Sequence, residues 1–143
     1  MLTGQLAIIA AALFSGAAFY VGFVEQPARL GLEDRALLAE WKPAYARGTT
    51  MQAPLAAAGF LIGLLAFWQS GNWYWLIGAV IIVANWPYTF IVIMPANRQL
   101  LSIEPATAGA ASRALIVRWG GLHAVRTGLG VAATAAFVWV SLR

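Results

Sequence analysis

Three side chains near the end of the sequence have the types and the spacing to form a reactive site. Trp119, His123 and Arg126 follow one another at i, i+4 and i+7, which places them on one face of a helix. An imidazole can take a proton near neutral pH, and a guanidinium can stabilise a negatively charged oxygen. Arg126 lies in an apolar segment, where a charge costs about 2.5–3.5 kcal/mol, so it needs a partner or a function. Glu25 is the nearest candidate partner, and the alternative is an interfacial arginine that reaches the headgroups.

A second set of polar side chains lies inside another apolar segment. Asn85, Tyr88 and Thr89 share a helix face at i, i+3 and i+4, with Trp86 and Pro87 between them. Unpaired polar groups are costly in hydrocarbon, so these side chains should face protein, water or a ligand. Pro87 frees a backbone carbonyl and predicts a kink in the helix. The alternative for this polar set is a group of hydrogen bonds that holds helices together.

The remaining candidates lie near the ends of apolar segments. We expect Tyr45, Arg47 and Asn97 to contribute polar groups to a pocket. Four aromatic side chains are candidates for a flat slot beside them: Trp41, Trp86, Tyr88 and Trp119. With one histidine, no cysteine and five acidic residues, the chain is not expected to bind zinc, copper or non-haem iron tightly.

The composition predicts a membrane protein with a single domain over residues 1–143. Hydrophobic residues make up 62% of the chain and charged residues 10%, with a mean hydropathy of +0.76; a soluble protein has roughly 25% charged residues. Four continuous apolar segments each approach the roughly 20 residues that a membrane-spanning helix needs. They are Leu2–Val24, Thr50–Ser70, Trp73–Met94 and Trp119–Leu142. We therefore expect an all-α bundle of four transmembrane helices rather than a barrel, whose strands alternate apolar and polar residues.

The basic residues predict how this bundle is oriented. The connections between spans 1 and 2 and between spans 3 and 4 hold seven of the nine Lys and Arg residues, whereas the opposite face holds only Arg143. Both long connections should therefore lie in the cytoplasm and both termini outside, in an integral protein of a bacterial inner membrane. The net charge of +4 is spread over membrane-proximal segments. That distribution indicates anionic lipid headgroups as partners rather than nucleic acid.

Similar exits from spans 1 and 3 indicate an internal repeat. Pro27-Ala28-Arg29 ends the first span, and Pro95-Ala96-Asn97 ends the third. Each should lead into a short interfacial helix, over about residues 33–47 and 106–117. Later, an aromatic residue or histidine follows a tryptophan by four residues in both halves, at 41/45 and 119/123. The pattern favours a parallel 2+2 duplication about an axis normal to the membrane, with chance similarity of two membrane exits as the alternative.

Taken together, these motifs resemble one family. The motifs that carry the resemblance are Pro27-Ala-Arg29, Trp41…Tyr45-x-Arg47-Gly48, Asn85-Trp-Pro-Tyr-Thr89, Pro95-x-Asn97 and Trp119…His123…Arg126. The chain is similar to the four-span membrane family of unknown-function proteins that includes the fungal anthrone oxygenases. The resemblance covers nearly the whole chain.

The resemblance implies oxidation of a flat, hydrophobic, acidic aromatic by O₂, without a cofactor. In this interpretation His123 takes a proton from the substrate, and Arg126 with Asn85 or Asn97 stabilises the enolate oxygen. Trp86 and Tyr88 stack on the rings, and Glu25 orients His123 or pairs with Arg126. Two other readings stay open. One is a haem-, quinone- or lipid-binding protein without turnover, with His123 as the ligand, and the other is a small transporter subunit. The sequence does not specify an oligomeric state.

Overall fold

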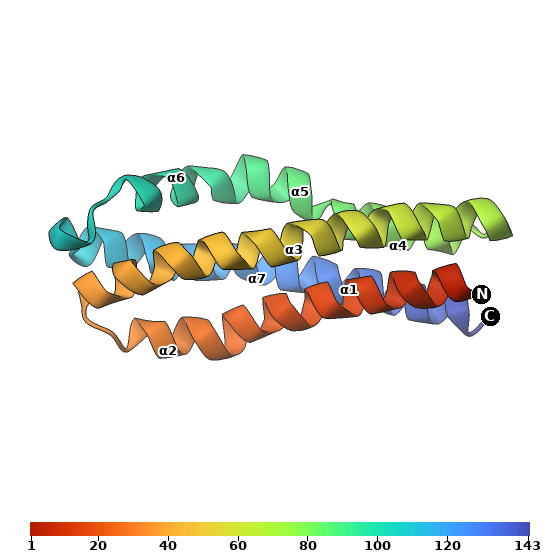
Figure 1. The fold of residues 1–143 in the computed structure, drawn as a ribbon, viewed down its shortest axis with the longest axis horizontal. Helices are drawn as coiled ribbons and strands as arrows, with labels where there is room; N and C mark the ends of the chain where they lie inside the picture. The colour runs from red at the N-terminus through yellow and green to blue at the C-terminus, as the bar shows by residue number, and fades with distance from the viewer.

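The computed structural model describes all 143 residues and contains four long helical segments packed side by side (Figure 1). The first segment comprises α1 (Leu2–Tyr20), the π-helical turn η1 (Val21–Glu25) and α2 (Gln26–Leu30). The second is the single helix α3 (Asp34–Ser70). The third comprises α4 (Trp73–Val83), α5 (Asn85–Tyr88), the π-helical turn η2 (Thr89–Ile93) and α6 (Met94–Ser102). After the 3₁₀ turn η3 (Pro105–Thr107), α7 (Ala110–Ser141) forms the fourth.

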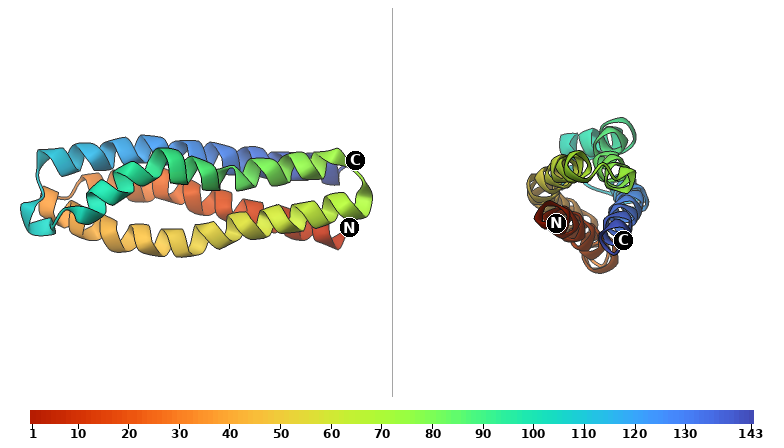
Figure 2. Two further views of the ribbon diagram at one scale, coloured as in Figure 1. Left: turned by 90° about the horizontal axis from the view of Figure 1, so that it is seen from above. Right: turned by 90° about the vertical axis from the view of Figure 1, so that its right-hand side faces the viewer.

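All four segments are long and apolar enough to cross a membrane. The prediction of an all-α bundle of four transmembrane helices is confirmed, and the chain is an integral membrane protein. Both termini lie at the same end of the bundle (Figures 1 and 2), as an even number of spans requires. Many large apolar side chains face outward, among them Trp68 and Leu142, as expected where the surroundings are lipid.

The predicted short interfacial helices are wrong as separate elements. The residues expected to form the first one, 33–47, continue without a break into α3, and most of those expected to form the second continue into α7. Charged residues end a hydrophobic segment, but they do not end a helix, because the backbone hydrogen bonds run on past them. The helix α3 begins where the Glu33 side chain accepts hydrogen bonds from the next residues, and it ends at Gly71, whose φ of 67° suits glycine.

The third segment bends where the sequence predicts a kink. α4 ends at Val83, one turn residue follows at Ala84, and a new helical segment begins at Asn85 (Figure 1). Pro87 has no N–H to donate to the carbonyl of Val83, four residues back, so the helix is interrupted there. The bend turns α5, η2 and α6 away from the line of α4.

The two halves of the chain repeat the same order of elements. A π-helical turn precedes Pro27 in the first half and Pro95 in the second, and in both halves it begins six residues before the proline. A π-helical turn widens the helix and often accompanies a functional site. The ring pairs also match, because Trp41 and Tyr45 stack at 5.0 Å and Trp119 lies 5.0 Å from His123. This correspondence agrees with the predicted 2+2 arrangement.

The apolar core consists of two clusters with polar side chains between them. The larger cluster lies toward the termini and packs alanines around Phe14, Trp75 and Phe137. The smaller one lies at the opposite end and includes Trp41 and Trp119. Between the two clusters lie the buried polar side chains Gln52, Asn85 and His123, with the half-buried Arg126. A polar layer in the middle of an apolar bundle is where a site is expected.

Candidate active site

His123 lies on the face of α7 that points into the bundle. Its side chain is 2% exposed, and its ring lies 5.0 Å from that of Trp119 at an interplanar angle of 33°. The Nδ1 atom of His123 has no hydrogen-bond partner in the protein. Nearly all buried polar atoms in proteins are paired, so an unpaired imidazole nitrogen beside a cavity is available for a proton or a ligand atom.

Arg126 lies one turn further along α7 and reaches toward α3. Its Nη2 donates a hydrogen bond to Oε1 of the buried Gln52 at 3.1 Å, and its guanidinium carbon lies 5.5 Å from the ring centroid of Phe14. No carboxylate lies within 4.0 Å of it, and its Nε has no partner. The expected pair between Arg126 and Glu25 is therefore wrong. Arg126 keeps its positive charge uncompensated by any acid, in the interior of the bundle.

Glu25 pairs with Arg29 instead. Its carboxylate lies 2.5 Å from Nη2 of Arg29, one turn along the same segment, and Glu40 of α3 approaches Nε of Arg29 to 3.0 Å. The guanidinium also lies 5.8 Å from the Trp119 ring centroid. Arg29 is only 3% exposed. Two carboxylates thus neutralise Arg29, and neither is left for Arg126.

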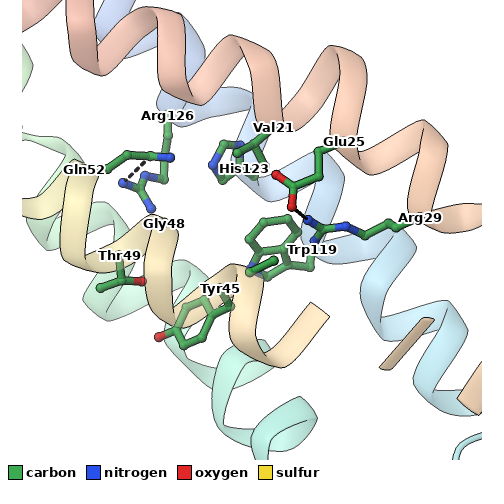
Figure 3. Close-up of a pocket in the computed structure, with 11 residues that line it drawn as sticks. Val21, Glu25, Arg29, Tyr45, Gly48, Thr49, Gln52, Trp119, His123 and Arg126 are labelled. Atoms are coloured by element: carbon green, nitrogen blue, oxygen red, sulfur yellow. Dashed lines mark hydrogen bonds and ion pairs between the residues drawn. The ribbon is translucent and has the colours of Figure 1, made fainter. Parts of the chain in front are cut away.

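These groups surround a cavity between the segment η1–α2, α3 and α7, with an empty volume of about 310 Å³ (Figure 3). Arg126 and Gln52 lie at one end of the view and the Glu25–Arg29 pair at the other, with His123 and Trp119 between them. The lining residues are Val21, Glu25, Arg29, Ala44, Tyr45, Gly48, Thr49, Gln52, Trp119, His123 and Arg126. The cavity therefore offers one imidazole, one uncompensated guanidinium and an aromatic wall.

A second cavity lies on the other side of Arg126, between α3 and the segment α5–η2–α6. It has an empty volume of about 530 Å³ and is lined by Tyr45, Thr49, Ala53, Asn85, Trp86, Thr89, Phe90, Met94 and Arg126. The structure therefore places Asn85 and Trp86 in this cavity and His123 in the first one. Tyr45, Thr49 and Arg126 line both cavities.

Three of the predicted site residues line neither cavity. Asn97 is fully buried. Its Oδ1 accepts a hydrogen bond from Trp119 Nε1 at 2.9 Å, and its Nδ2 donates one to the Tyr45 hydroxyl at 3.3 Å. Tyr88 donates its hydroxyl to the carbonyl of Leu122 at 2.8 Å. Arg47 is exposed on the outside of α3. Asn97 thus holds two aromatic walls in place, whereas Arg47 lines an outer groove next to the first cavity, together with Glu25 and Gln52.

Several lining residues were not among the predicted site residues, and Gln52 and Thr49 are two of them. Gln52 holds Arg126, and Thr49 lies between the two cavities. The signal for both was present in the sequence, because Tyr45, Thr49 and Gln52 follow at i, i+4 and i+7. That spacing forms one helix face only if the helix begins before residue 45.

No group of three or more His, Cys, Asp or Glu side chains is placed to hold a metal ion. Among the lining side chains, Tyr45 and Met94 are of types that serve as axial haem ligands, and so is His123. Its free Nδ1 lies on a ring already packed against Trp119.

Fold and site together define a small integral membrane protein with a polar, cationic pocket between two apolar clusters. The model of the anthrone oxygenase family matches residues 41–136, which include every predicted site residue except Glu25. The chain belongs to the anthrone oxygenase family, as its motifs predicted, and an oxygenase-like function follows from this membership. Neither the comparison with curated proteins nor that with solved structures gives a significant match.

Proposed function

We propose that the protein is an oxygenase that uses O₂ to oxidise the activated methylene of a flat, hydrophobic aromatic ketone of the anthrone type. The observation that carries the proposal is the Arg126 guanidinium, which has no carboxylate partner and lies one turn from the unpaired Nδ1 of His123. A base beside an uncompensated cation is what the formation of an enolate requires.

The reaction balances with O₂ as the only oxidant. Removal of one methylene proton gives a delocalised enolate, which passes one electron to O₂ and combines with the superoxide formed. The resulting hydroperoxide then loses its second C–H proton while its O–O bond breaks. The methylene becomes a carbonyl and the second oxygen atom leaves as water. The substrate supplies the electrons, so the chain has to supply a base, a proton donor and stabilisation of negative charge.

The side chains of the first cavity divide these tasks. His123 takes the first proton and returns it to the peroxide, and it then takes the second C–H proton and returns it to the leaving hydroxide. Arg126 stabilises the enolate oxygen in surroundings of low dielectric constant, where a charge interaction is stronger than in water. Gln52 positions Arg126 through its hydrogen bond, and Trp119 positions His123 by ring contact. Substrate rings bind against the aromatic side chains that line the two cavities.

We further propose that this end of the bundle faces the cytoplasm of a bacterial inner membrane. Seven of the nine basic residues lie at this end, in the long connections and the adjoining helix ends. This excess supports the orientation by the positive-inside rule.

The test measures O₂ consumption by the purified protein in mild detergent with an anthrone as substrate. His123→Asn should lower the turnover by about 10²–10⁴-fold, the usual contribution of a general base. Thr134→Val, which removes a hydroxyl that lines neither cavity, should leave the turnover unchanged. Full turnover in His123→Asn would refute the base role.

The same preparation distinguishes the cofactor-binding alternative. A visible absorption band in the wild-type protein that disappears in His123→Asn would make His123 a ligand rather than a base. Turnover without such a band would support the proposed reaction.

A further inference from the structure

The two cavities beside Arg126 differ in chemistry although they occupy related places in the two halves of the bundle. Glu25, Arg29 and His123 line the first, whereas the second has no acid, no histidine and Arg126 as its only basic residue. Its walls are mostly apolar, with Trp86, Phe90 and Met94 among them. An apolar cavity with a few polar groups is typical of a site for a small hydrophobic molecule.

Asn85 contributes an unused hydrogen-bond acceptor to the second cavity. Its side chain is 1% exposed, and its Nδ2 donates to the carbonyl of Ile82 at 3.0 Å. Because a carbonyl can only accept, this bond fixes the orientation of the amide. The Oδ1 atom is therefore the other end of the group, and it has no partner. A buried acceptor left unpaired is destabilising unless a ligand donates to it.

Thr89 and Arg126 contribute unused groups to the same cavity. A threonine in a helix commonly donates its hydroxyl to the carbonyl four residues back, as Thr50 and Thr134 do here. The hydroxyl of Thr89 makes no such bond, and Nε of Arg126 is also without a partner. The cavity thus presents one atom that can only accept, one that can only donate, and one hydroxyl that can do either.

The geometry points to a ligand that carries a hydroxyl group. We propose that the second cavity binds a flat, uncharged aromatic through a phenolic hydroxyl group, and discriminates against the corresponding quinone or ether. Asn85 Oδ1 accepts from the hydroxyl, and Arg126 Nε donates to an oxygen of the ligand. A quinone has only acceptor oxygens, so one of them would face Asn85 Oδ1 without a proton between them.

Such a ligand can reach the cavity directly from the lipid. Trp86 is 40% exposed and Phe90 is 61% exposed on the outside of the bundle, where a membrane would surround them. The indole Nε1 of Trp86 donates to the carbonyl of Ala53 at 3.2 Å and so links the two walls of the cavity. The opening between α3 and α5 is therefore framed by an aromatic side chain rather than by a charge.

This inference deepens the proposed function and rests on it for the choice of an aromatic ligand. It assigns the hydroxyl-bearing ring to the second cavity and the methylene to the first, beside His123, with Arg126 lining both cavities. Binding can be measured without O₂ and without turnover, so the two proposals can fail separately.

The test compares two fluorescent probes of nearly equal shape, 2-hydroxyanthracene and 2-methoxyanthracene. Binding is measured under argon to the intact protein in lipid nanodiscs, with protein-free nanodiscs to subtract partition into lipid. The hydroxyl compound should bind about tenfold more tightly, the effect of one buried hydrogen bond. Asn85→Leu should abolish this preference. Ala53→Phe should weaken the binding of both probes, because the larger side chain fills the cavity. The matched control Thr134→Val should change neither dissociation constant.

Equal binding of the two probes to the wild-type protein would overturn the inference, as would unchanged binding in Ala53→Phe. Neither measurement depends on Asn85, so the test holds even if Asn85→Leu fails to fold. His123→Asn should keep both dissociation constants, because His123 lines only the first cavity. If the preference is found but no anthrone is oxidised, the proposed reaction fails and the binding site stands. If turnover is found without the preference, the reaction stands and this inference fails.

Discussion

Two arginines at the same end of the bundle should respond oppositely to the same substitution. Arg126→Met should change stability little and remove activity, whereas Arg29→Met should destabilise the fold. The reason is the difference in their partners. Arg29 lies between two carboxylates, at 2.5 and 3.0 Å, and Arg126 has a neutral amide at 3.1 Å.

The magnitude for Arg126 follows from terms that nearly cancel. Placing its charge in the bundle costs about 2.5–3.5 kcal/mol. The hydrogen bond that this charged group donates to Gln52 returns about 1.5–3 kcal/mol, and the approach to Phe14 returns about 0.5–1 kcal/mol. A methionine at this position has neither the cost of the buried charge nor the two stabilising interactions, so the free energy of unfolding should change by about 1 kcal/mol or less. Turnover should fall by about 10²–10³-fold, as when a donor to a developing oxyanion is removed.

Arg29→Met removes the only cation between Glu25 and Glu40. Breaking a buried ion pair costs about 3–5 kcal/mol, and the two carboxylates here are 26% and 35% exposed. Water can therefore screen part of the charge, and about 2 kcal/mol is expected. Denaturant-induced unfolding in detergent micelles, followed by tryptophan fluorescence, measures both variants. A loss of 2 kcal/mol or more in Arg126→Met, with no larger loss in Arg29→Met, would refute this division of roles.

Three further predictions concern the fold and its orientation. Gly78→Ala should destabilise the bundle by about 1–3 kcal/mol, because the new methyl group would lie 2.4 Å from the buried ring of Phe137; denaturant unfolding measures it. Arg113→Ala should make the connection between α2 and α3 more sensitive to protease, because Arg113 bonds Asp34 at 2.5 Å and the carbonyls of Leu30 and Leu32; unchanged cleavage would contradict this role. The chain has no cysteine, so Ser141→Cys should react with a membrane-impermeant thiol reagent in intact cells and Thr107→Cys only after permeabilisation. The opposite labelling would reverse the proposed orientation.

The number of spans and the bend were predictable because each depends on local sequence. The length of an apolar segment predicts a membrane span. A proline lacks the N–H of a helical hydrogen bond, so Pro87 predicted the interruption at Ala84. The face shared by Trp119, His123 and Arg126 was equally local, because helix periodicity alone fixes it. For these features no knowledge of the neighbouring helices was needed.

The partners across helices were not predictable in the same way. The hydropathy pattern started the second span at Thr50, which hid the face formed by Tyr45, Thr49 and Gln52. Glu25 was predicted to pair with Arg126 because the two residues lie at a similar depth in the membrane. Arg29, however, lies one turn from Glu25 on the same segment and forms the ion pair with it. Helix periodicity also does not predict how one helix is rotated relative to its neighbours. It therefore could not show that Asn85 and His123 line different cavities.

The length of the helices sets the depth of the site. At a rise of 1.5 Å per residue, α7 measured from Ser141 reaches Arg126 after about 22 Å, His123 after about 27 Å and Trp119 after about 33 Å. The hydrocarbon of a bilayer is about 30 Å thick. If Ser141 marks one surface, Arg126 lies within the hydrocarbon and Trp119 at the headgroups of the opposite leaflet. Arg126 and His123 thus lie near the boundary between the hydrocarbon and the headgroups. The hydrocarbon, which dissolves O₂ well, can supply the oxidant, and water within one or two helix turns can exchange protons with the site.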